Sequence, residues 1–325
     1  MEPWYIRMAE ERDIPRPLLL AAVRARVATR LARERRGGAD AVAARQRDLR
    51  LRLATAPITV RPDAANEQHY EVPPDFFQLC LGPHLKYSSC VFPAGVRDLE
   101  GAERAMLALT CARAGLADGQ RVLELGCGWG SLTLWMAQHY PGSSITAVSN
   151  SALQRQYIED RARERGLGNI EVITTDVADL QLDGPFDRVV SVEMLEHVKN
   201  HPALFARVAR WLHPDGAFFI HVFTHRDLAF EFADDDERDW IGRHFFTGGT
   251  MPSDDLLLHA ANDFAVADHW QLSGTHYART ALAWDDNLVA NRAEATAVLE
   301  RAHPGEGERW FRRWRLFFLA CAGLW

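Results

Sequence analysis

From residue 121 onward, short apolar runs alternate with longer segments whose apolar residues recur at helical spacing. Five runs have the length and composition of buried strands: RVLEL (121–125), ITAVS (145–149), IEVITT (170–175), FDRVVSV (186–192) and GAFFIHVF (216–223). Helices are expected from Ser131, from Ser151 and over residues 201–212. Strands that alternate with helices are typical of parallel sheets. The pattern therefore predicts an α/β fold with a doubly wound, mostly parallel sheet.

The chain before this alternation follows a different pattern. Residues 15–53 place Leu, Val and Ala at helical spacing between arginines, and Gly37 and Gly38 divide the segment into two expected helices. A Pro-rich connector follows over residues 55–77. We expect residues 1–100 to form a helical N-terminal extension and connector that help to cover the functional site. Residues 101–325 form the expected core.

Residues 224–262 interrupt the alternation after the fifth strand. The interruption contains HRDLAFEFADDDERDW and RHFFTGGTMPS, and FAVADHWQL (264–272) then predicts a further strand. Long insertions in compact domains are usually functional. We therefore interpret residues 224–262 as a lid or a substrate-facing insertion.

Composition is that of a soluble globular protein, with 47% hydrophobic and 25% charged residues among 325. The net charge of -7 is unevenly distributed, because residues 1–60 carry 13 Arg and 7 acidic residues, a local charge of +6. An Arg-rich amphipathic segment can face nucleic acid or anionic lipid, but a solvated helix face is the more common explanation. No aromatic residues are interleaved to stack on bases, which argues against nucleic acid as a partner.

The five cysteines are odd in number and lack paired short spacing, which favours a reducing compartment and argues against a zinc site. The opening residues MEPWYIRMAEERD carry acidic side chains where a signal peptide needs an apolar core. No apolar run approaches the length that spans a membrane. We expect a cytoplasmic protein without a metal.

The stretch LELGCGWG (123–130) follows the first expected strand and opens a helix. Gly126, Gly128 and Gly130 lack side chains, so backbone amides can approach a ligand closely. The stretch lacks the Lys and Ser/Thr of a P-loop, and its GxGxG spacing differs from the dinucleotide fingerprint. Glu124 at the strand end suits a cationic ligand better than a pyrophosphate.

Five stretches together resemble a known family. LELGCGWG is similar to the first motif of class I S-adenosylmethionine-dependent methyltransferases, which have a Rossmann-like fold. YSSCVF (87–92), VSNSALQRQYI (148–158), SVEMLEHVKN (191–200) and RHFFTGGTMPS (243–253) resemble the coclaurine N-methyltransferase branch of the cyclopropane fatty acid synthase-like family, from about His69 onward. The resemblance implies a methyltransferase that uses S-adenosylmethionine and releases S-adenosylhomocysteine.

The resemblance also implies a set of cofactor-binding residues. Tyr87, Ser88, Gly126 and Gly128 match positions at the methionine end, Asn150 and Gln154 match the ribose side, and Asp176 and Val177 match the adenine side. Some have simpler explanations: Asn150 as a helix cap, Asp176 as a turn residue and Ser88 as a loop hydroxyl. All eight fall at expected carboxyl ends of strands or in the connector, which favours a cofactor site.

Glu193, Glu196 and His197 follow the fourth expected strand within five residues. Alone, ExxEH is more typical of the charged start of a helix. The resemblance places the family's catalytic carboxylates and histidine at these positions. It implies in-line methyl transfer to the nitrogen of a small cyclic or aromatic amine, in which Glu and His assist proton removal. A zinc motif is excluded because the second histidine at helical spacing is missing.

The alternative is cyclopropanation or C-methylation of an unsaturated lipid, which would bring the protein into contact with a membrane. Cyclopropane synthases hold a bicarbonate base with a Cys, a Glu, a His and a Tyr. Glu196, His221 and Tyr277 match three of these positions, whereas Ser89 occupies the position of the Cys. That difference weakens the lipid hypothesis without removing it, because a hydroxyl can also hold an anion. A non-catalytic binding protein is disfavoured, since the acids on the acceptor side are present.

The lid carries three aromatic residues, Trp240, Phe245 and Phe246, that could enclose an aromatic amine or simply pack the insertion against the core. Both readings stay open, and the identity of the acceptor does not follow from the sequence. In the family a last strand follows the helix expected over residues 309–325, where this chain ends. We therefore expect six strands in the main sheet. A homodimer is compatible with the sequence.

Overall fold

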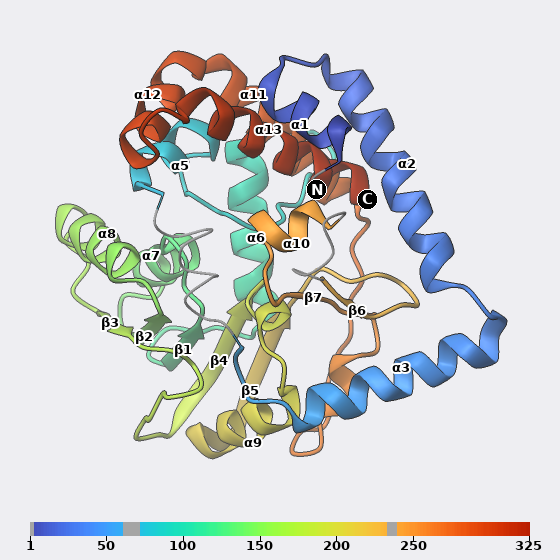
Figure 1. Ribbon diagram of the computed structural model, residues 1–325. Coiled ribbons are helices and arrows are strands. Elements are labelled where there is room, and N and C mark those ends of the chain that lie inside the picture. Colours follow the sequence, from blue (N-terminus) through green and yellow to red (C-terminus); the bar gives the residue numbers. More distant parts are fainter. Residues whose placement is uncertain (1–2, 61–71, 233–238) are drawn as a thin grey trace.

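The computed structural model describes residues 3–60, 72–232 and 239–325 (Figure 1). Its main sheet has five parallel strands in the order β3-β2-β1-β4-β5. They are β1 (Arg121–Leu125), β2 (Ser144–Ser149), β3 (Ile170–Thr174), β4 (Phe186–Val192) and β5 (Leu212–His221). The strand order reverses between β1 and β4, and a crevice at the carboxyl ends is expected at such a point. The predicted doubly wound sheet is confirmed.

Helices cover both faces of this sheet. They are α6 (Leu99–Arg113), α7 (Ser131–His139), α8 (Ala152–Glu164) and α9 (His201–Trp211). Neighbouring residues of β1 point to opposite faces: Val122 packs in a cluster with α6 and α7, whereas Leu123 packs in one with α9. This alternation follows from the period of two in a strand. Because both faces are buried, the strands read as nearly continuous apolar runs.

The predicted pair of N-terminal helices is present as α2 (Arg16–Glu34) and α3 (Gly38–Thr55), after a short α1 (Trp4–Glu11). Gly37 between them has a φ of 86°, a left-handed conformation that suits glycine. In Figure 1, α2 runs beside α13 and α3 continues toward α9. Much of the predicted Pro-rich connector, residues 61–71 with His69, lies outside the described residues.

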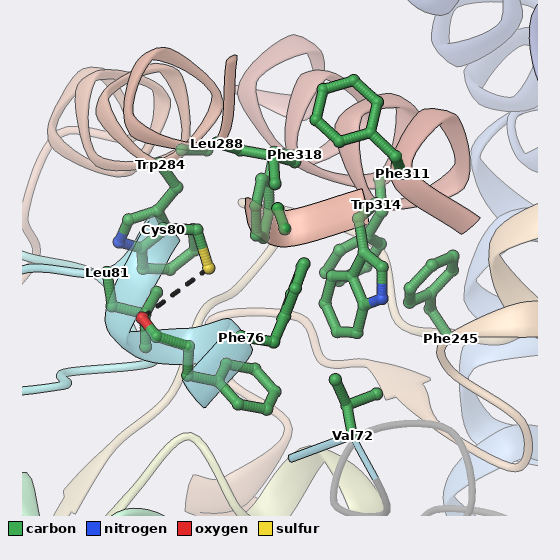
Figure 2. Close-up of a cluster of buried hydrophobic side chains, with 14 of the residues drawn as sticks. Val72, Phe76, Cys80, Leu81, Phe245, Trp284, Leu288, Phe311, Trp314 and Phe318 are labelled. Atoms are coloured by element: carbon green, nitrogen blue, oxygen red, sulfur yellow. Dashed lines mark hydrogen bonds between the residues drawn. The ribbon is translucent and has the colours of Figure 1, made fainter. Parts of the chain in front are cut away.

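A helical layer lies over the carboxyl ends of the strands (Figure 1). It contains α5 (Pro74–Cys80), α11 (Thr275–Ala290), α12 (Arg292–Ala302) and α13 (Gly307–Leu324). Its interior is aromatic, with Phe76, Trp284, Trp314 and Phe318 fully buried around one another (Figure 2). The helix expected over residues 309–325 is therefore confirmed.

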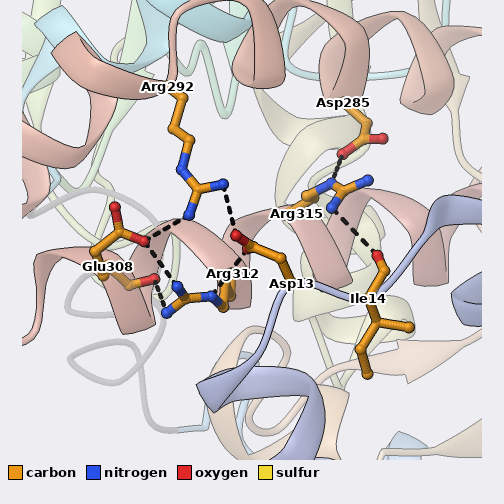
Figure 3. Close-up of polar contacts among 7 residues, drawn as sticks. All are labelled: Asp13, Ile14, Asp285, Arg292, Glu308, Arg312 and Arg315. Carbon is orange, nitrogen blue, oxygen red and sulfur yellow. Dashed lines mark hydrogen bonds and ion pairs between the residues drawn. The ribbon is translucent and has the colours of Figure 1, made fainter.

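Ion pairs bind the N-terminal segment to these C-terminal helices. Asp13 accepts hydrogen bonds from Arg292 and Arg312, at 2.9 and 3.1 Å (Figure 3). Arg315 joins Asp285 of α11, at 3.1 Å, to the carbonyl oxygen of Ile14. The segment after α1 is thus attached to α11, α12 and α13 at once.

The insertion after β5 forms little regular structure. It contains β6 (Phe230–Glu231) paired antiparallel with β7 (Thr250–Met251), the short helix α10 (Trp240–His244) and the 3-10 turn η2 (Leu257–Ala260). Part of the acidic run in the predicted lid, residues 233–238, lies outside the described residues. Within the described part of the chain, no helix is long and apolar enough to span a bilayer.

The prediction of a strand over residues 264–272 is wrong, and so is the prediction of six strands. The described residues form five in the main sheet, and residues 264–272 form no regular element. Val266, Trp270 and Leu272 remain 54, 42 and 40% exposed, so the apolar residues of this run do not share one buried face. Apolar character suggested a strand, but a strand also needs a paired edge and a face to bury.

Candidate active site

The loop after β1 brings backbone close to a cavity. The N–H groups of Gly126 and Cys127 both donate to the carbonyl of Val148 on β2, at 3.0 and 2.9 Å. Gly126 has a φ of 79°, and a Cβ there would come within 2.5 Å of Met194. Gly128 has a φ of 52° and open space where its Cβ would stand. The first glycine permits packing, whereas the second leaves room for a ligand.

Glu124 precedes this loop and is buried at the end of β1. The hydroxyl of Thr133 on α7 donates to its Oε2 at 2.5 Å. Burial raises the pKa of Glu124 to about 8, and the bond from Thr133 opposes the shift only in part. A cationic group that entered the cavity would favour the ionised form of this carboxyl.

The loop after β2 contributes Asn150 and Gln154. The side chain that caps α8 is Ser151, whose hydroxyl accepts from the N–H of Gln154 at 3.3 Å, so the simpler interpretation of Asn150 as this cap is wrong. The hydroxyl of Ser149 donates to Oε1 of Gln154 at 2.6 Å. Nε2 of Gln154 is buried without an acceptor among the described residues. Such a donor is the kind of group a ligand satisfies.

Asp176 follows β3 and does act as a turn residue, because its Oδ1 accepts from the N–H of Ala178 at 2.6 Å. The same oxygen accepts from the hydroxyl of Thr59 at 2.9 Å, which ties the connector to this strand end. Asp176 also lines the cavity together with Val177. A role in a turn and a position in the cavity wall are therefore compatible.

A single cavity at the carboxyl ends of the strands gathers all of the predicted cofactor residues. Its wall includes Tyr87, Ser88, Gly126, Gly128, Asn150, Gln154, Asp176 and Val177. Glu193 and His197 line it as well. Lys86, Thr59 and Thr247 also belong to the wall but were missed by the sequence analysis. Thr59 lies in none of the quoted motifs, whereas Thr247 lies within RHFFTGGTMPS (243–253) and Lys86 directly precedes YSSCVF and is one of only two lysines in the chain.

Glu193 lies directly after β4 in an unusual backbone conformation. Its φ is 48°, which is strained for a residue with a Cβ. Oε1 accepts from the N–H of Ser89 at 2.8 Å, and Oε2 accepts from the hydroxyl of Tyr277 at 2.7 Å. Nε2 of His221 lies 3.7 Å from Oε1. Three segments distant in the chain therefore converge on one carboxylate.

Glu196 lies in the 3-10 turn η1 (Leu195–His197) and is only 1% exposed. Oε1 accepts from the N–H of Phe223 at 2.9 Å, whereas Oε2 is buried with no hydrogen-bond partner in the described structure. The ring of His197 lies 4.5 Å from that of Phe246. Helix α9 begins only at His201. The interpretation of this stretch as a solvated helix start is therefore wrong.

Burial controls the ionisation of this cluster. It raises the pKa of Glu193, against the Lys86 charge and the bonds from Ser89 and Tyr277. It raises the pKa of Glu196 well above the usual range, and the Glu193 charge raises it further. Burial, helped by Lys86, lowers the pKa of His221 to about 3. At neutral pH, His221 is therefore uncharged, and it belongs to the same cluster as two carboxyl groups whose pKa values are raised.

The structure separates the three aromatic residues of the predicted lid. The ring of Phe246 lies beside the acidic cluster, near His197 and 4.9 Å from the ring of Phe232. Phe245 is fully buried and stacks on Phe317 at 4.3 Å in the helical layer (Figure 2). Trp240 is buried too, and its Nε1 donates to Glu10 at 2.9 Å. In the described structure Phe245 and Trp240 pack the insertion, and Phe246 alone of the three contacts the cluster.

The strand order, the glycine loop and the cavity above the strand ends define a class I methyltransferase fold. The profile of the Mycolic acid cyclopropane synthetase family matches residues 59–325, and the chain belongs to this family. The resemblance inferred from the sequence is confirmed.

Two comparisons concern N-methyltransferases. A crystal structure of coclaurine N-methyltransferase bound to N-methylheliamine and SAH matches with a TM-score of 0.93 and 32% identity, over 98% of this chain and 93% of that chain. The (S)-coclaurine N-methyltransferase of Thalictrum flavum subsp. glaucum is 40% identical over 236 residues, 72% of this chain. That alignment spans 65% of the length of the plant protein, slightly less than two thirds.

A third relative is a cyclopropane synthase. The cyclopropane-fatty-acyl-phospholipid synthase of Escherichia coli (strain K12) is 32% identical over 259 residues, 79% of this chain and 63% of that protein. The family thus contains both chemistries that the sequence analysis considered.

Proposed function

We propose that this protein is an S-adenosylmethionine-dependent methyltransferase that methylates the nitrogen of a small cyclic or aromatic amine, similar to coclaurine. In this proposal residues 1–100 form the extension and connector, residues 101–325 form the core, and residues 224–262 form the lid. The N-methyltransferase assignment is supported by the names of the plant relative at 40% identity and of the solved structure that matches with a TM-score of 0.93.

The observation that carries the proposal is the set of groups around Glu193. The lipid alternative needs Ser89, His221 and Tyr277 free to hold a bicarbonate. Instead, the Ser89 N–H and the Tyr277 hydroxyl donate to Glu193, and His221 lies 3.7 Å from it. A carboxylate of the chain itself already accepts from the Ser89 N–H and the Tyr277 hydroxyl and lies beside His221, and its negative charge would repel a bicarbonate placed there. A fixed carboxylate suits an acceptor that arrives as an ammonium ion, because it attracts the charge and accepts the proton.

The residues present fit the cofactor. Tyr87, Ser88, Gly126 and Gly128 would hold its methionine end, Asn150 and Gln154 its ribose, and Asp176 and Val177 its adenine. Two features support this fit: the open space at Gly128 and the unpaired buried amide nitrogen of Gln154. When bound, S-adenosylmethionine supplies an electrophilic methyl group on its sulfonium.

The acidic cluster would manage the proton of the amine. The hydrogen bonds from Ser89 and Tyr277 favour the ionised form of Glu193, so we assign it as the group that attracts the ammonium and accepts its proton. Glu196, whose pKa is raised by burial and by the charge of Glu193, would stay protonated and neutral beside it. His197 lines the same cavity and would relay the proton outward. Because His221 is neutral, it does not itself compete with the ammonium for Glu193.

Incubation with cofactor labelled in its methyl group tests the proposal, with a panel of cyclic amines in one arm and unsaturated phospholipid vesicles in the other. Label is expected in the amines. Label in the lipid fraction alone would overturn the assignment in favour of lipid methylation or cyclopropanation, and label in neither would show that the acceptor class is wrong.

A further inference from the structure

Lys86 is a buried cation beside the proposed cofactor site. It is one of two lysines in the chain and is 3% exposed. Its Nζ donates to Oγ of Ser88 at 2.6 Å and to the carbonyl of Ser89 at 2.7 Å. An ammonium has three N–H donors, so these two bonds leave one. The third N–H of the Lys86 ammonium is therefore left for a ligand in the cavity.

Lys86 has no carboxylate partner in the described parts of the chain, where no ion pair brings an acid within 4.0 Å of Nζ. Nearby acids use their oxygens elsewhere. Glu103 accepts from the backbone N–H groups of His84 and Lys86, at 2.9 and 3.2 Å. Glu193 accepts from Ser89 and Tyr277. The charges of Glu103 and Glu193 act on Lys86 at longer range, but neither carboxylate accepts a hydrogen bond from Nζ in the described structure, which leaves the place of a direct anionic partner to a ligand.

Ser88 adds a second donor at the same place. Because its Oγ already accepts from Lys86, its own hydrogen is directed elsewhere, and no acceptor for it occurs among the described residues. Ser88 and Lys86 line the same cavity as Gly126 and Gly128. The acids of the described wall are Glu124, Asp176 and Glu193, and none of them attracts an anion. Lys86 is the one Lys or Arg of the described wall.

We propose that the ammonium of Lys86 and the hydroxyl of Ser88, which it orients, form the binding subsite for the carboxylate of the cofactor's methionine end. The inference rests on the proposed function. It follows from the charges of the ligand, because S-adenosylmethionine carries a sulfonium, an ammonium and a single negative group. That group is the carboxylate, and it must be placed in a cavity whose remaining charged side chains are acidic.

Calorimetric titration tests this subsite without turnover. Wild type, Lys86→Met and Lys86→Arg are titrated with S-adenosylhomocysteine and with its decarboxylated analogue, which keeps the amine. Wild type should bind S-adenosylhomocysteine about 10- to 100-fold more tightly than the analogue, as expected for a charge-assisted hydrogen bond. Lys86→Met should lose this preference while its affinity for the analogue stays within about threefold of wild type. Lys86→Arg should keep part of the preference, because it keeps the charge.

Lys199→Met is the matched control. Lys199 is also buried, at 5% exposure, but it pairs with Glu231 at 2.7 Å and does not line the cavity. Its loss should lower stability and leave the preference for the carboxylate unchanged. If Lys86→Met lost affinity for both ligands to the same extent, Lys86 would only support the loop, and the inference would be overturned. If the Met variant does not fold, Lys86→Gln provides the same comparison.

The wild-type protein alone also tests the carboxylate subsite. Equal affinity for the two ligands overturns the carboxylate subsite, whatever the variants do. If wild type binds neither ligand, the proposed function fails as well. If wild type binds S-adenosylhomocysteine and methylates an amine, but Lys86→Met keeps the full preference, the subsite fails and the proposed function stands.

Discussion

The proposed cofactor side of the cavity is held mainly by bonds between neighbouring positions, whereas the acidic cluster is held by bonds from distant segments. Ser149 and Gln154 are five positions apart, and Asp176 bonds the N–H two positions later. By contrast, Ser89 and Tyr277 reach Glu193 across 104 and 84 positions. On the proposed cofactor side, the bond from Thr59 to Asp176 is an exception and spans 117 positions.

This difference separates two kinds of constraint. The strand-end loops keep their geometry as long as the sheet forms, because the bonds that shape them are made within the sheet. The ionisation of Glu193 depends on how the connector, β5 and α11 pack together. Changes in the outer helices can therefore alter the acceptor chemistry and leave the cofactor side intact, which is how one fold supports several reactions.

Glu193→Gln should break the acceptor side while sparing the cofactor side. The amide keeps the size of the side chain but cannot accept the proton, so we expect kcat for a methylated amine to fall about 10²- to 10⁴-fold. Affinity for S-adenosylhomocysteine should change by no more than about threefold, since the cofactor donors are untouched. Steady-state kinetics and calorimetry measure the two effects.

Glu171→Gln on the exposed edge of β3 is the control for Glu193→Gln, and it should leave both quantities unchanged. Near-normal turnover in Glu193→Gln would move the base assignment to Glu196 or His197. A parallel loss of cofactor affinity would contradict the separation of the two sides.

The insertion after β5, the proposed lid, offers a matched pair of variants. Phe245→Ala should lower the free energy of unfolding by about 3–5 kcal/mol, because this fully buried ring stacks on Phe317. Phe246→Ala should cost less stability, since the ring is only partly buried, but should raise KM for an aromatic amine about tenfold through lost ring contact. Denaturant titration and kinetics would expose the reverse pattern if Phe245 were the residue in contact with substrate.

The fold around the proposed cofactor side could be predicted from the sequence because its information is local, whereas the eight cofactor residues were inferred from the resemblance to the family. Strands β1 to β4, the glycine loop and the helix starts follow from apolar period and capping residues. The arrangement around Glu193 could not, since nothing in SVEMLEHVKN specifies that Ser89 and Tyr277 donate to it. The different positions of Phe245 and Phe246 could not be predicted for the same reason. The two residues are identical in type, and only tertiary packing decides which one is buried. The strand expected over residues 264–272 failed because composition does not supply a pairing edge.

Gly126 and Gly128 of the loop after β1 are expected to play different roles on the proposed cofactor side, one in packing and one in ligand binding. Gly128→Ala adds a Cβ into open space at a φ of 52°, so unfolding free energy should fall by only about 1–2 kcal/mol. Affinity for S-adenosylhomocysteine should fall at least about tenfold, because the methyl group occupies ligand space. Gly126→Ala should instead lose mainly stability, since its Cβ would meet Met194 at 2.5 Å. Thermal denaturation and calorimetry distinguish them, and equal effects of both variants on both quantities would contradict the assignment.

Tyr277→Phe should have the smallest effect and the most specific one. The phenol donates to Glu193 at 2.7 Å and so favours the ionised carboxylate. Its own pKa is raised well above the usual range by burial and by Glu193, so it stays a donor throughout the neutral range. Without it the pKa of Glu193 rises, and less of the base is ionised at a given pH. In a plot of kcat against pH, the acidic limb should therefore move to higher pH.

At pH 7 we expect turnover of Tyr277→Phe to fall about three- to tenfold, and the deficit should shrink as pH rises because Glu193 then ionises despite the missing bond. Tyr140→Phe, outside the cavity, controls for loss of a hydroxyl and should leave the profile unchanged. A uniform loss at every pH would mean that Tyr277 acts on the shape of the acceptor pocket and not on the ionisation of Glu193. An unchanged profile would mean that Glu193 is not the titrating base, and the acceptor side would then depend on Glu196.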